Sequence, residues 1–376
     1  MKILTVFKQM SLHSHIPERS FGRCLQAILL LSVTVLAGPV PVMADPLPPA
    51  PGPVGPVHRG DDGSIVATRS GGPIRVCPTA GPGCDATSLA AALADAPNGS
   101  TIVLAAGVYR QGAVIALNAI TLSGEDGAKI EGGAVEGKAA LVVTGNDTVI
   151  TGIDCSGISV PDHNGACVRL EGRNLTLRHV HFHDSEEGIL TGGGTGTVTV
   201  EDSLFERLGA GGRAHGLYIG DSDALILRRT SVLASTGEGH EVKSRAARTT
   251  IDGCVIASLG GVDSRLIDAS NGGIVTITGS VLEKGPASAN DQLIGFGLEG
   301  FTHSANSLTI DTSIIIKDRG SARLVLGDVA PSLSATKVIG GTSQDAGAAQ
   351  WFPSRDAAGM AAYPYLPPAP GATSLR

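Results

Sequence analysis

The stretch L-T-L-R-H-V-H-F, residues 175–182, contains two short segments in which apolar and polar side chains alternate. Period-2 alternation of this kind is typical of β-strands. The first segment recurs as a triplet at 175–177, 198–200, 225–227, 249–251, 275–277 and 308–310. The last residues of successive triplets are 23, 27, 24, 26 and 33 positions apart. A repeat near 25 residues predicts strands that stack one turn above another.

Each triplet is followed by a second short β-rich segment, for example 180–182, 203–205 and 231–233. No segment with helical periodicity separates these strands, so they cannot be parallel strands joined by crossover helices. A chain coiled around itself is the remaining way to pair them. We therefore predict an all-β solenoid, a parallel β-helix with about 25 residues per turn, over residues 76–345. A short helix at 88–96 is expected to cap its N-terminal end.

The segment T-I-V-L-A-A-G-V-Y at 101–109, together with the coil repeats that follow it, resembles the pectate-lyase-like β-helix superfamily. The resemblance covers residues about 85 to 330. It implies a right-handed parallel β-helix. The superfamily includes lyases, hydrolases, C5-epimerases, phage tailspikes and adhesins, so the resemblance is specific for the fold and much less specific for a reaction.

The N-terminal region predicts export. Four basic residues precede the apolar run at 25–37, which is too short to span a bilayer, and the small-residue site at 42–44 suits cleavage. We expect residues 1–44 to be a signal peptide and 45–75 a Pro/Gly-rich linker with extended, solvated backbone. Residues 346–376 are expected to form an irregular tail. The mature protein should be periplasmic or secreted and free of the membrane.

Charge and cysteine content limit the classes of partner and of site. A net charge of −7 and an isoelectric point near 5.8 argue against nucleic acid. In an oxidising compartment Cys77 with Cys84, and Cys155 with Cys167, are close enough in sequence to form disulfides. Cys254 is expected to be a small buried apolar residue. No C-x-x-C pair is present, so a zinc-binding cysteine motif is excluded.

A third strand in each turn aligns on the inward residues Leu217, Val242, Ile267 and Ile294. Alternation then predicts that Tyr218, Lys243 and Asp268 point outward in one column. Arg245 and Ser270 lie in the next column. Neighbouring members of a column lie about 4.8 Å apart. A phenol, an ammonium, a guanidinium and a carboxylate are therefore expected on one small patch.

These groups suit β-elimination from a uronic acid, or C5-epimerisation, which needs the same groups. Arg245 is the candidate that neutralises the substrate carboxylate. Lys243 is the candidate base, provided that cationic neighbours or burial favour its neutral form, and Tyr218 is the candidate acid. The alternative interpretation of the column is a ladder of opposite charges that joins neighbouring turns.

The strand register predicts further candidate residues around this patch. His215 and His240 begin successive strands and are either catalytic groups or corner residues bonded to backbone. The remaining candidates for substrate binding are Arg265, Glu241, Asn271 and Glu299. The pair formed by Lys243 and Arg265 is similar to one used by the alginate-lyase branch of the superfamily, but the R-H-G expected in that branch is replaced by R-L-I-D.

We assign no residue to a metal site and no certain cofactor. Calcium is an alternative helper, with Glu238, Glu241 and Asp268 as its ligands. His181 and His183 should face outward with Asp184 and could bind a metal adventitiously, although solvated histidines are the simpler interpretation.

The predicted function is action on an acidic polysaccharide by a monomeric protein, through lyase or epimerase chemistry. A non-catalytic polysaccharide-binding or cell-surface protein is the alternative from another class. Glycoside hydrolysis is less favoured, because the N-T-D and D-D pairs of polygalacturonase-like enzymes are absent.

Overall fold

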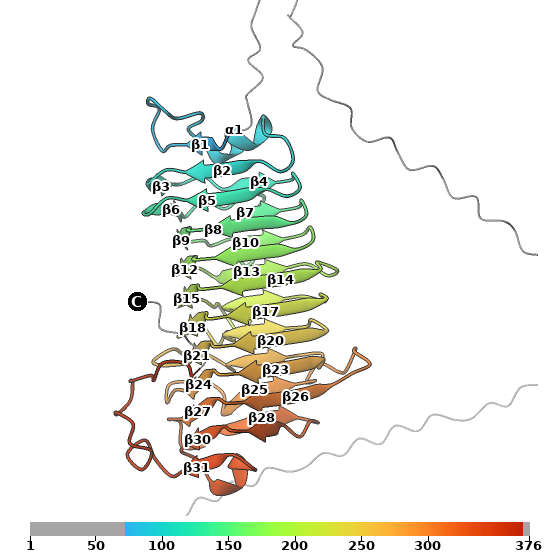
Figure 1. The fold of residues 1–376 in the computed structure, drawn as a ribbon, viewed down its shortest axis with the longest axis vertical. Coiled ribbons are helices and arrows are strands. Elements are labelled where there is room, and N and C mark those ends of the chain that lie inside the picture. The colour runs from blue at the N-terminus through green and yellow to red at the C-terminus, as the bar shows by residue number, and fades with distance from the viewer. Residues whose placement is uncertain (1–71, 371–376) are drawn as a thin grey trace, which may run out of the picture. The chain divides into compact units, whose positions relative to one another are not determined.

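A computed structural model describes residues 72–370 of the chain. These residues form a right-handed parallel β-helix of about 10 turns with about 26 residues per turn, in which the strands of successive turns lie one above another (Figure 1). The fold predicted from the repeats, and implied by the resemblance to pectate-lyase-like proteins, is therefore confirmed. The expected signal peptide lies outside the described residues, as does the expected linker apart from residues 72–75.

Each complete turn contributes one strand to each of three parallel sheets, called sheets A, B and C here. Sheet A contains β1 Ile74–Val76, β2 Thr101–Leu104, β5 Thr121–Gly124, β8 Thr148–Thr151, β11 Leu175–Arg178, β14 Thr197–Glu201, β17 Ala224–Arg228, β20 Arg248–Asp252, β23 Ile274–Thr278, β26 Ser307–Asp311 and β29 Ser332–Ser334. Sheet B contains β3 Gly107–Tyr109, β6 Ala128–Glu131, β9 Asp154–Ser156, β12 His181–His183, β15 Leu204–Glu206, β18 Ser231–Leu233, β21 Val255–Ala257, β24 Val281–Lys284, β27 Ile314–Lys317, β30 Lys337–Ile339 and β31 Gln350–Phe352. Sheet C contains β4 Ala113–Ile115, β7 Ala139–Val143, β10 Ala166–Leu170, β13 Glu187–Thr191, β16 Leu217–Ile219, β19 Val242–Ser244, β22 Ile267–Ala269, β25 Gln292–Phe296 and β28 Arg323–Gly327.

The strand register agrees with the repeats in the sequence. In sheet A the last residues of the predicted triplets pair in one continuous column, from Leu177 through Val200, Leu227, Ile251 and Ile277 to Ile310. All six side chains are buried in the apolar core inside the coil. The alternation of apolar and polar residues thus reports directly which face of each strand is inside.

The corner between sheets A and B is a tight turn with a left-handed backbone. The first residue after each sheet A strand from β8 to β29 has a positive φ, and the set is Gly152, His179, Asp202, Arg229, Gly253, Gly279, Thr312 and Ala335. Only three of the eight are glycine, so the stacked turns hold five other residues in a conformation that glycine adopts more easily. This repeated corner keeps the sheet B strands in register.

The expected helix lies at the N-terminal end of the coil, and both expected disulfides are in the N-terminal half of the described chain. Helix α1, Leu89–Ala94, begins after the capping residue Ser88, whose hydroxyl accepts from the Ala91 amide, and it packs Leu89 and Leu93 into the core. The disulfides Cys77–Cys84 and Cys155–Cys167 are formed. Cys254 is free and buried, as predicted.

The C-terminal segment 346–376, which the sequence predicts as an irregular tail, contains strand β31 in its described part. Strand β31 pairs with β30 in sheet B. Further on, Arg355 forms an ion pair with Asp318 at 2.6 Å, and Ala369 packs against Val281, Ile316 and Ile339. Among the residues that the structure describes, no helix has the length and apolar character needed to cross a membrane.

Candidate functional site

A groove of about 560 Å³ lies over the outer face of sheet C. Its floor is formed by side chains of β10, β13, β16 and β19, namely Arg169, Leu190, Tyr218 and Lys243, and Glu187 and His215 also line it. Residues of two loops, at 162–164 and at 212–213, form its walls. We call this cavity the sheet C groove.

The floor of the groove is a register column. Arg169 pairs with Leu190, Leu190 with Tyr218, Tyr218 with Lys243, and Lys243 with Asp268. The alignment of Tyr218, Lys243 and Asp268 predicted from the sequence is the observed one. The column continues in the other direction to Arg169, which the sequence analysis did not include.

Tyr218 lies close to both Lys243 and Arg245. The Arg245 Nε donates a hydrogen bond to the Tyr218 hydroxyl at 3.1 Å. The Lys243 ammonium and the Arg245 guanidinium lie 5.2 Å and 5.7 Å from the centre of the Tyr218 ring. A cation at this distance from an aromatic face is attracted to it. The Tyr218 ring and its hydroxyl therefore lie beside two cationic side chains.

Both cations are also bound to a carboxylate from a later turn. Lys243 donates to Glu299 at 2.8 Å, and Arg245 forms an ion pair with the same carboxylate. Burial opposes ionisation of Glu299, but its contacts with Lys243 and Arg245 lower its pKa below the usual range. This arrangement argues against Lys243 as the base and favours an electrostatic role.

Glu299 belongs to the segment 297–306 between β25 and β26, which we call the Glu299 loop. The loop is held against β19 and β22: Asn271 Nδ2 donates to the Gly300 carbonyl at 3.1 Å, and His303 Nε2 lies 3.1 Å from the Arg245 carbonyl. Asn271 Oδ1 also accepts from Arg245 at 2.9 Å. Asn271, a candidate for substrate binding, is thus 8% exposed and positions both Arg245 and the loop.

Asp268 lies in the predicted column but is not open to solvent. Its side chain is 4% exposed. It accepts from the Ser270 hydroxyl at 2.6 Å, while Arg265 and His240 lie 3.8 Å and 3.6 Å from its oxygens. The next position in the column is Gly295, where an added Cβ would meet Asp268, Arg265 and Leu298 of the Glu299 loop. The loop covers this end of the patch, so the expectation of an accessible Asp268 was wrong.

His215 and His240 are corner residues whose rings bond to backbone. The Nδ1 of His215 accepts from the His240 amide at 3.0 Å, and the Nδ1 of His240 accepts from the Arg265 amide at 3.1 Å. The rings stack 4.8 Å apart. Burial lowers the pKa of His215 to about 2 and that of His240 to about 3, with nearby cations adding to both effects. Each ring is therefore neutral with its proton on Nε2, which makes it a donor and not a base.

Glu241 was expected to bind substrate, and the structure contradicts this. Its side chain is fully buried, and one carboxyl oxygen accepts from the Ser235 amide at 3.1 Å. Burial and the neighbouring Asp263 raise its pKa well above the usual range. Glu238, Glu241 and Asp268 also do not form a cluster of ligand atoms that could hold calcium among residues 72–370.

Glu187 is a buried acid under the groove that the sequence analysis did not select. Neither of its oxygens makes a hydrogen bond of normal geometry, although the His215 amide is near enough to favour the charged form slightly. Burial dominates and raises the pKa of Glu187 well above its usual range, against the attraction of Arg169 and Lys243. Its neighbour Glu186 instead fixes the groove wall, accepting from Gly165 at 2.7 Å and from Val160 at 3.0 Å.

Comparisons with known proteins give structural similarity alone. No family model matches the chain, and no curated protein matches it in sequence. Pectin methylesterase PemA from Erwinia chrysanthemi is 12% identical with a TM-score of 0.43, covering 76% of this chain and 94% of that one. An alginate lyase from Paenibacillus sp. is 16% identical with a TM-score of 0.43, covering 71% and 93%. A pectin methylesterase from Aspergillus niger is 13% identical with a TM-score of 0.44, covering 75% and 90%.

Proposed function

We propose that the sheet C groove binds an acidic polysaccharide and that its residues move the proton on carbon 5 of a uronate, by β-elimination or by C5-epimerisation. The observation that carries the proposal is the register column that sets Arg169, Tyr218 and Lys243 along one groove above the buried Glu187. An exported protein, as residues 1–44 predict, would meet such polymers.

The charge of the groove favours an anionic ligand despite the net negative charge of the chain. Arg169 and Lys243 are three turns apart on the column, a separation of roughly 14 Å from the spacing of stacked strands. Arg213 adds a third cation at the wall. The Nε of Arg169 lies 3.5 Å from a carboxylate oxygen of Glu171, without the geometry of a hydrogen bond. A guanidinium on the groove floor suits a ligand carboxylate, which it binds through two parallel N–H groups.

Tyr218 and Glu187 are the proposed proton-transfer groups. In an elimination, the deprotonated Tyr218 oxygen takes the carbon 5 proton while Arg169 stabilises the charge that develops on the uronate carboxylate. Lys243 binds another group of the polymer further along the groove. The bond from carbon 4 to its bridging oxygen breaks, and that oxygen takes the proton of Glu187. One product carries a double bond between carbons 4 and 5, and the other a free 4-hydroxyl. Return of the proton from Tyr218 to Glu187 through water restores the site.

Epimerisation uses the same first step. Glu187 would then return a proton to carbon 5 from the opposite face, and no carbon–oxygen bond would break. Both outcomes need one group that takes a proton and one group that gives a proton. Burial raises the pKa of Glu187, which favours its protonated form and suits it to give the proton.

A non-catalytic polysaccharide-binding protein is the second candidate. The observation that favours it is the pairing of both Lys243 and Arg245 with Glu299, since cations already neutralised by the protein contribute less to catalysis. In this case the groove would hold the polymer through Arg169 and Arg213 without a chemical step.

The test is a screen of polymannuronate, polygalacturonate and glucuronan in D₂O. Absorbance at roughly 235 nm detects the unsaturated product of elimination, and deuterium at carbon 5 detects proton exchange by either reaction. Arg169→Ala and Lys243→Ala should reduce turnover at least about 100-fold. The matched control Arg248→Ala, an exposed cation on β20, should not.

The two candidates separate on the same samples. Exchange or elimination with any of the polymers supports the catalytic proposal. Binding to a polymer without either signal would replace it with the binding protein. Absence of both binding and turnover across the panel would overturn the acidic polysaccharide as ligand.

A further inference from the structure

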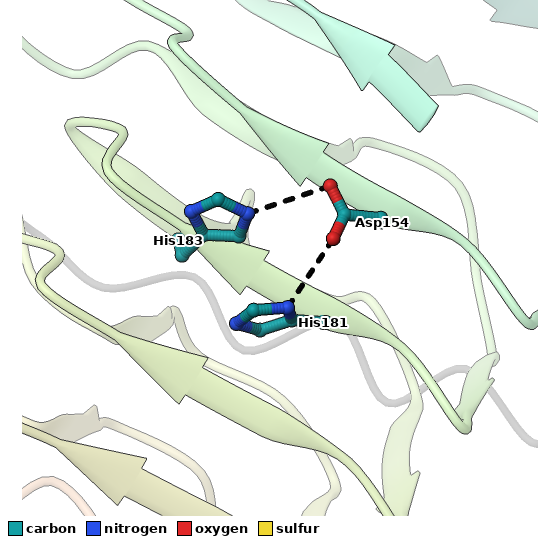
Figure 2. Close-up of side chains that lie close together, drawn as sticks. All are labelled: Asp154, His181 and His183. Carbon is teal, nitrogen blue, oxygen red and sulfur yellow. Dashed lines mark hydrogen bonds and ion pairs between the residues drawn. The ribbon is translucent and has the colours of Figure 1, made fainter. Parts of the chain in front are cut away.

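A second cluster of chemically active side chains lies on sheet B, on a different sheet from the groove. Asp154 of β9 and His181 of β12 are register partners, and His183 lies two residues further along β12 (Figure 2). Between the two histidines, Phe182 points into the core and is fully buried. Strand alternation therefore places both imidazoles on the outer face beside the carboxylate.

The two imidazoles converge on the two oxygens of Asp154. His181 Nδ1 lies 3.2 Å from Asp154 Oδ2, and His183 Nε2 lies 3.4 Å from Asp154 Oδ1. One nitrogen from each ring and one carboxylate oxygen all lie within 4.8 Å of one another. Ligand atoms of a tetrahedral zinc site with bonds of about 2.1 Å are separated by roughly 3.4 Å. The two nitrogen–oxygen separations, 3.2 Å and 3.4 Å, are close to this value.

The outward nitrogen of each ring is held by a further carboxylate. His181 Nε2 lies 3.0 Å from Glu206 Oε1, and His183 Nδ1 lies 2.6 Å from Asp184 Oδ2. Arg207 in turn contacts both carboxylates, each at 2.8 Å. In metal sites an outer carboxylate commonly fixes the tautomer and orientation of a ligating histidine. Both histidines here have that support, and each directs its second nitrogen to Asp154.

The cluster contains more carboxylates than cationic side chains. Asp154, Asp184 and Glu206 all contact the two imidazoles. Arg207 is the one guanidinium in contact with these carboxylates among the described residues. Lys129, the register partner of Asp154 in the turn before, forms no ion pair with it there. The excess of carboxylates favours a cation between the rings.

The backbone that carries the ligands is held rigidly. Cys155, next to Asp154, is joined by a disulfide to Cys167 of β10. Behind the histidines, the rings of Phe182 and Phe205 pack edge to face with centres 5.3 Å apart. A preformed ligand set loses little conformational freedom when a metal binds, which favours affinity.

We propose that Asp154, His181 and His183 bind a late first-row divalent cation of the Zn²⁺ class. Two imidazole nitrogens and one carboxylate oxygen suit this class better than Ca²⁺ or Mg²⁺, which prefer oxygen ligands. The three side chains leave a fourth position for water or a ligand. The bound cation would join the turn of β9 to that of β12 and stabilise the coil. This proposal is independent of the function proposed for the groove.

The test is titration of the full-length, metal-stripped and untagged protein with Zn²⁺ by calorimetry, and with Co²⁺ by visible absorption. We expect one ion per chain, a Co²⁺ spectrum of a four-coordinate site, and a higher Tm with Zn²⁺. His181→Ala, His183→Ala and Asp154→Asn should each weaken binding at least about 10-fold. The control His179→Gln, an exposed histidine outside the cluster, should bind as the natural protein does.

Two results would overturn the proposal: no Zn²⁺ binding at all, or Zn²⁺ binding that the three ligand variants leave unchanged. Tighter binding of Ca²⁺ than of Zn²⁺ would contradict the class of metal. If an alanine variant does not fold, Glu206→Gln provides the second measurement. It keeps all three ligands and should weaken Zn²⁺ binding about 10-fold through the loss of the carboxylate that orients His181.

Discussion

The carboxylate of Glu299 lies 2.8 Å from the ammonium of Lys243, although the two residues are 56 positions apart in the chain. The Glu299 loop therefore places a negative charge against Lys243, which lines the groove, and against its neighbour Arg245. A uronate carboxylate that approaches Lys243 has to compete with this internal carboxylate.

Replacing Glu299 should strengthen binding of an acidic polymer. In Glu299→Gln the competing charge is gone while the shape of the loop is kept, and we expect affinity to rise roughly 5-fold, or about 1 kcal/mol. Calorimetry with a uronate oligosaccharide measures this. Glu238→Gln, which also removes one exposed acid, is the control. Weaker binding by Glu299→Gln would show that Glu299 contacts the ligand instead of competing with it.

Tyr218→Phe should remove turnover and keep binding. The substitution deletes the oxygen to which Arg245 donates and leaves the ring that packs near Lys243. Loss of a group that transfers a proton reduces kcat by roughly 100-fold to 10,000-fold. Tm should change little, because the residue is partly exposed and the ring remains. Tyr365→Phe, at an exposed tyrosine, should be neutral in both respects. Unchanged kcat in Tyr218→Phe would remove Tyr218 from the mechanism.

Glu187→Gln should have an effect on stability that depends on pH. The folded pKa of Glu187 is raised by burial, so the folded state keeps a proton that the unfolded state releases above about pH 4.3. The natural protein therefore loses stability as pH rises, by at most about 1.4 kcal/mol per pH unit from this residue. Glutamine cannot ionise, so the Tm of the variant relative to the natural protein should rise from pH 5 to pH 8. A constant Tm difference would mean that Glu187 is already ionised.

His215 and His240 should remain neutral throughout the range in which most histidines titrate. Their pKa values are about 2 and about 3 in the folded state, because burial disfavours the charged ring. Nitrogen NMR should find both rings neutral, with the proton on Nε2, from pH 8 down to about pH 5. Because the unfolded state gains protons below about pH 6.5 and the folded state does not, these residues also make stability fall as pH decreases. A titration of either ring near pH 6.5 would contradict this.

The repeats predicted the coil and the register of the column, because both follow from strand periodicity in the core. Arg169 and Glu187 were missed because the steps along the column, from Tyr218 back to Leu190 and then to Arg169, are 28 and 21 residues, away from the 25-residue spacing used in the alignment. Corner loops of unequal length cause this variation.

The burial of Asp268 depends on a contact between turns that periodicity does not describe. Its cover is the Glu299 loop, and the 33-residue step between Ile277 and Ile310 is the trace that this insertion leaves in the sequence. The 33-residue spacing indicates that this turn contains a longer loop. It does not indicate which sheet of the coil the loop covers. The buried position of Glu241 likewise depends on side-chain packing at the corner next to Ser235.

The most direct test of the central claim is a crystal structure of the Tyr218→Phe variant with a uronate tetrasaccharide. We expect the oligosaccharide in the sheet C groove, with one carboxylate against Arg169, another group of the chain against Lys243, and carbon 5 of one sugar facing position 218. An oligosaccharide bound to sheet A or sheet B, with the groove left empty, would contradict the account.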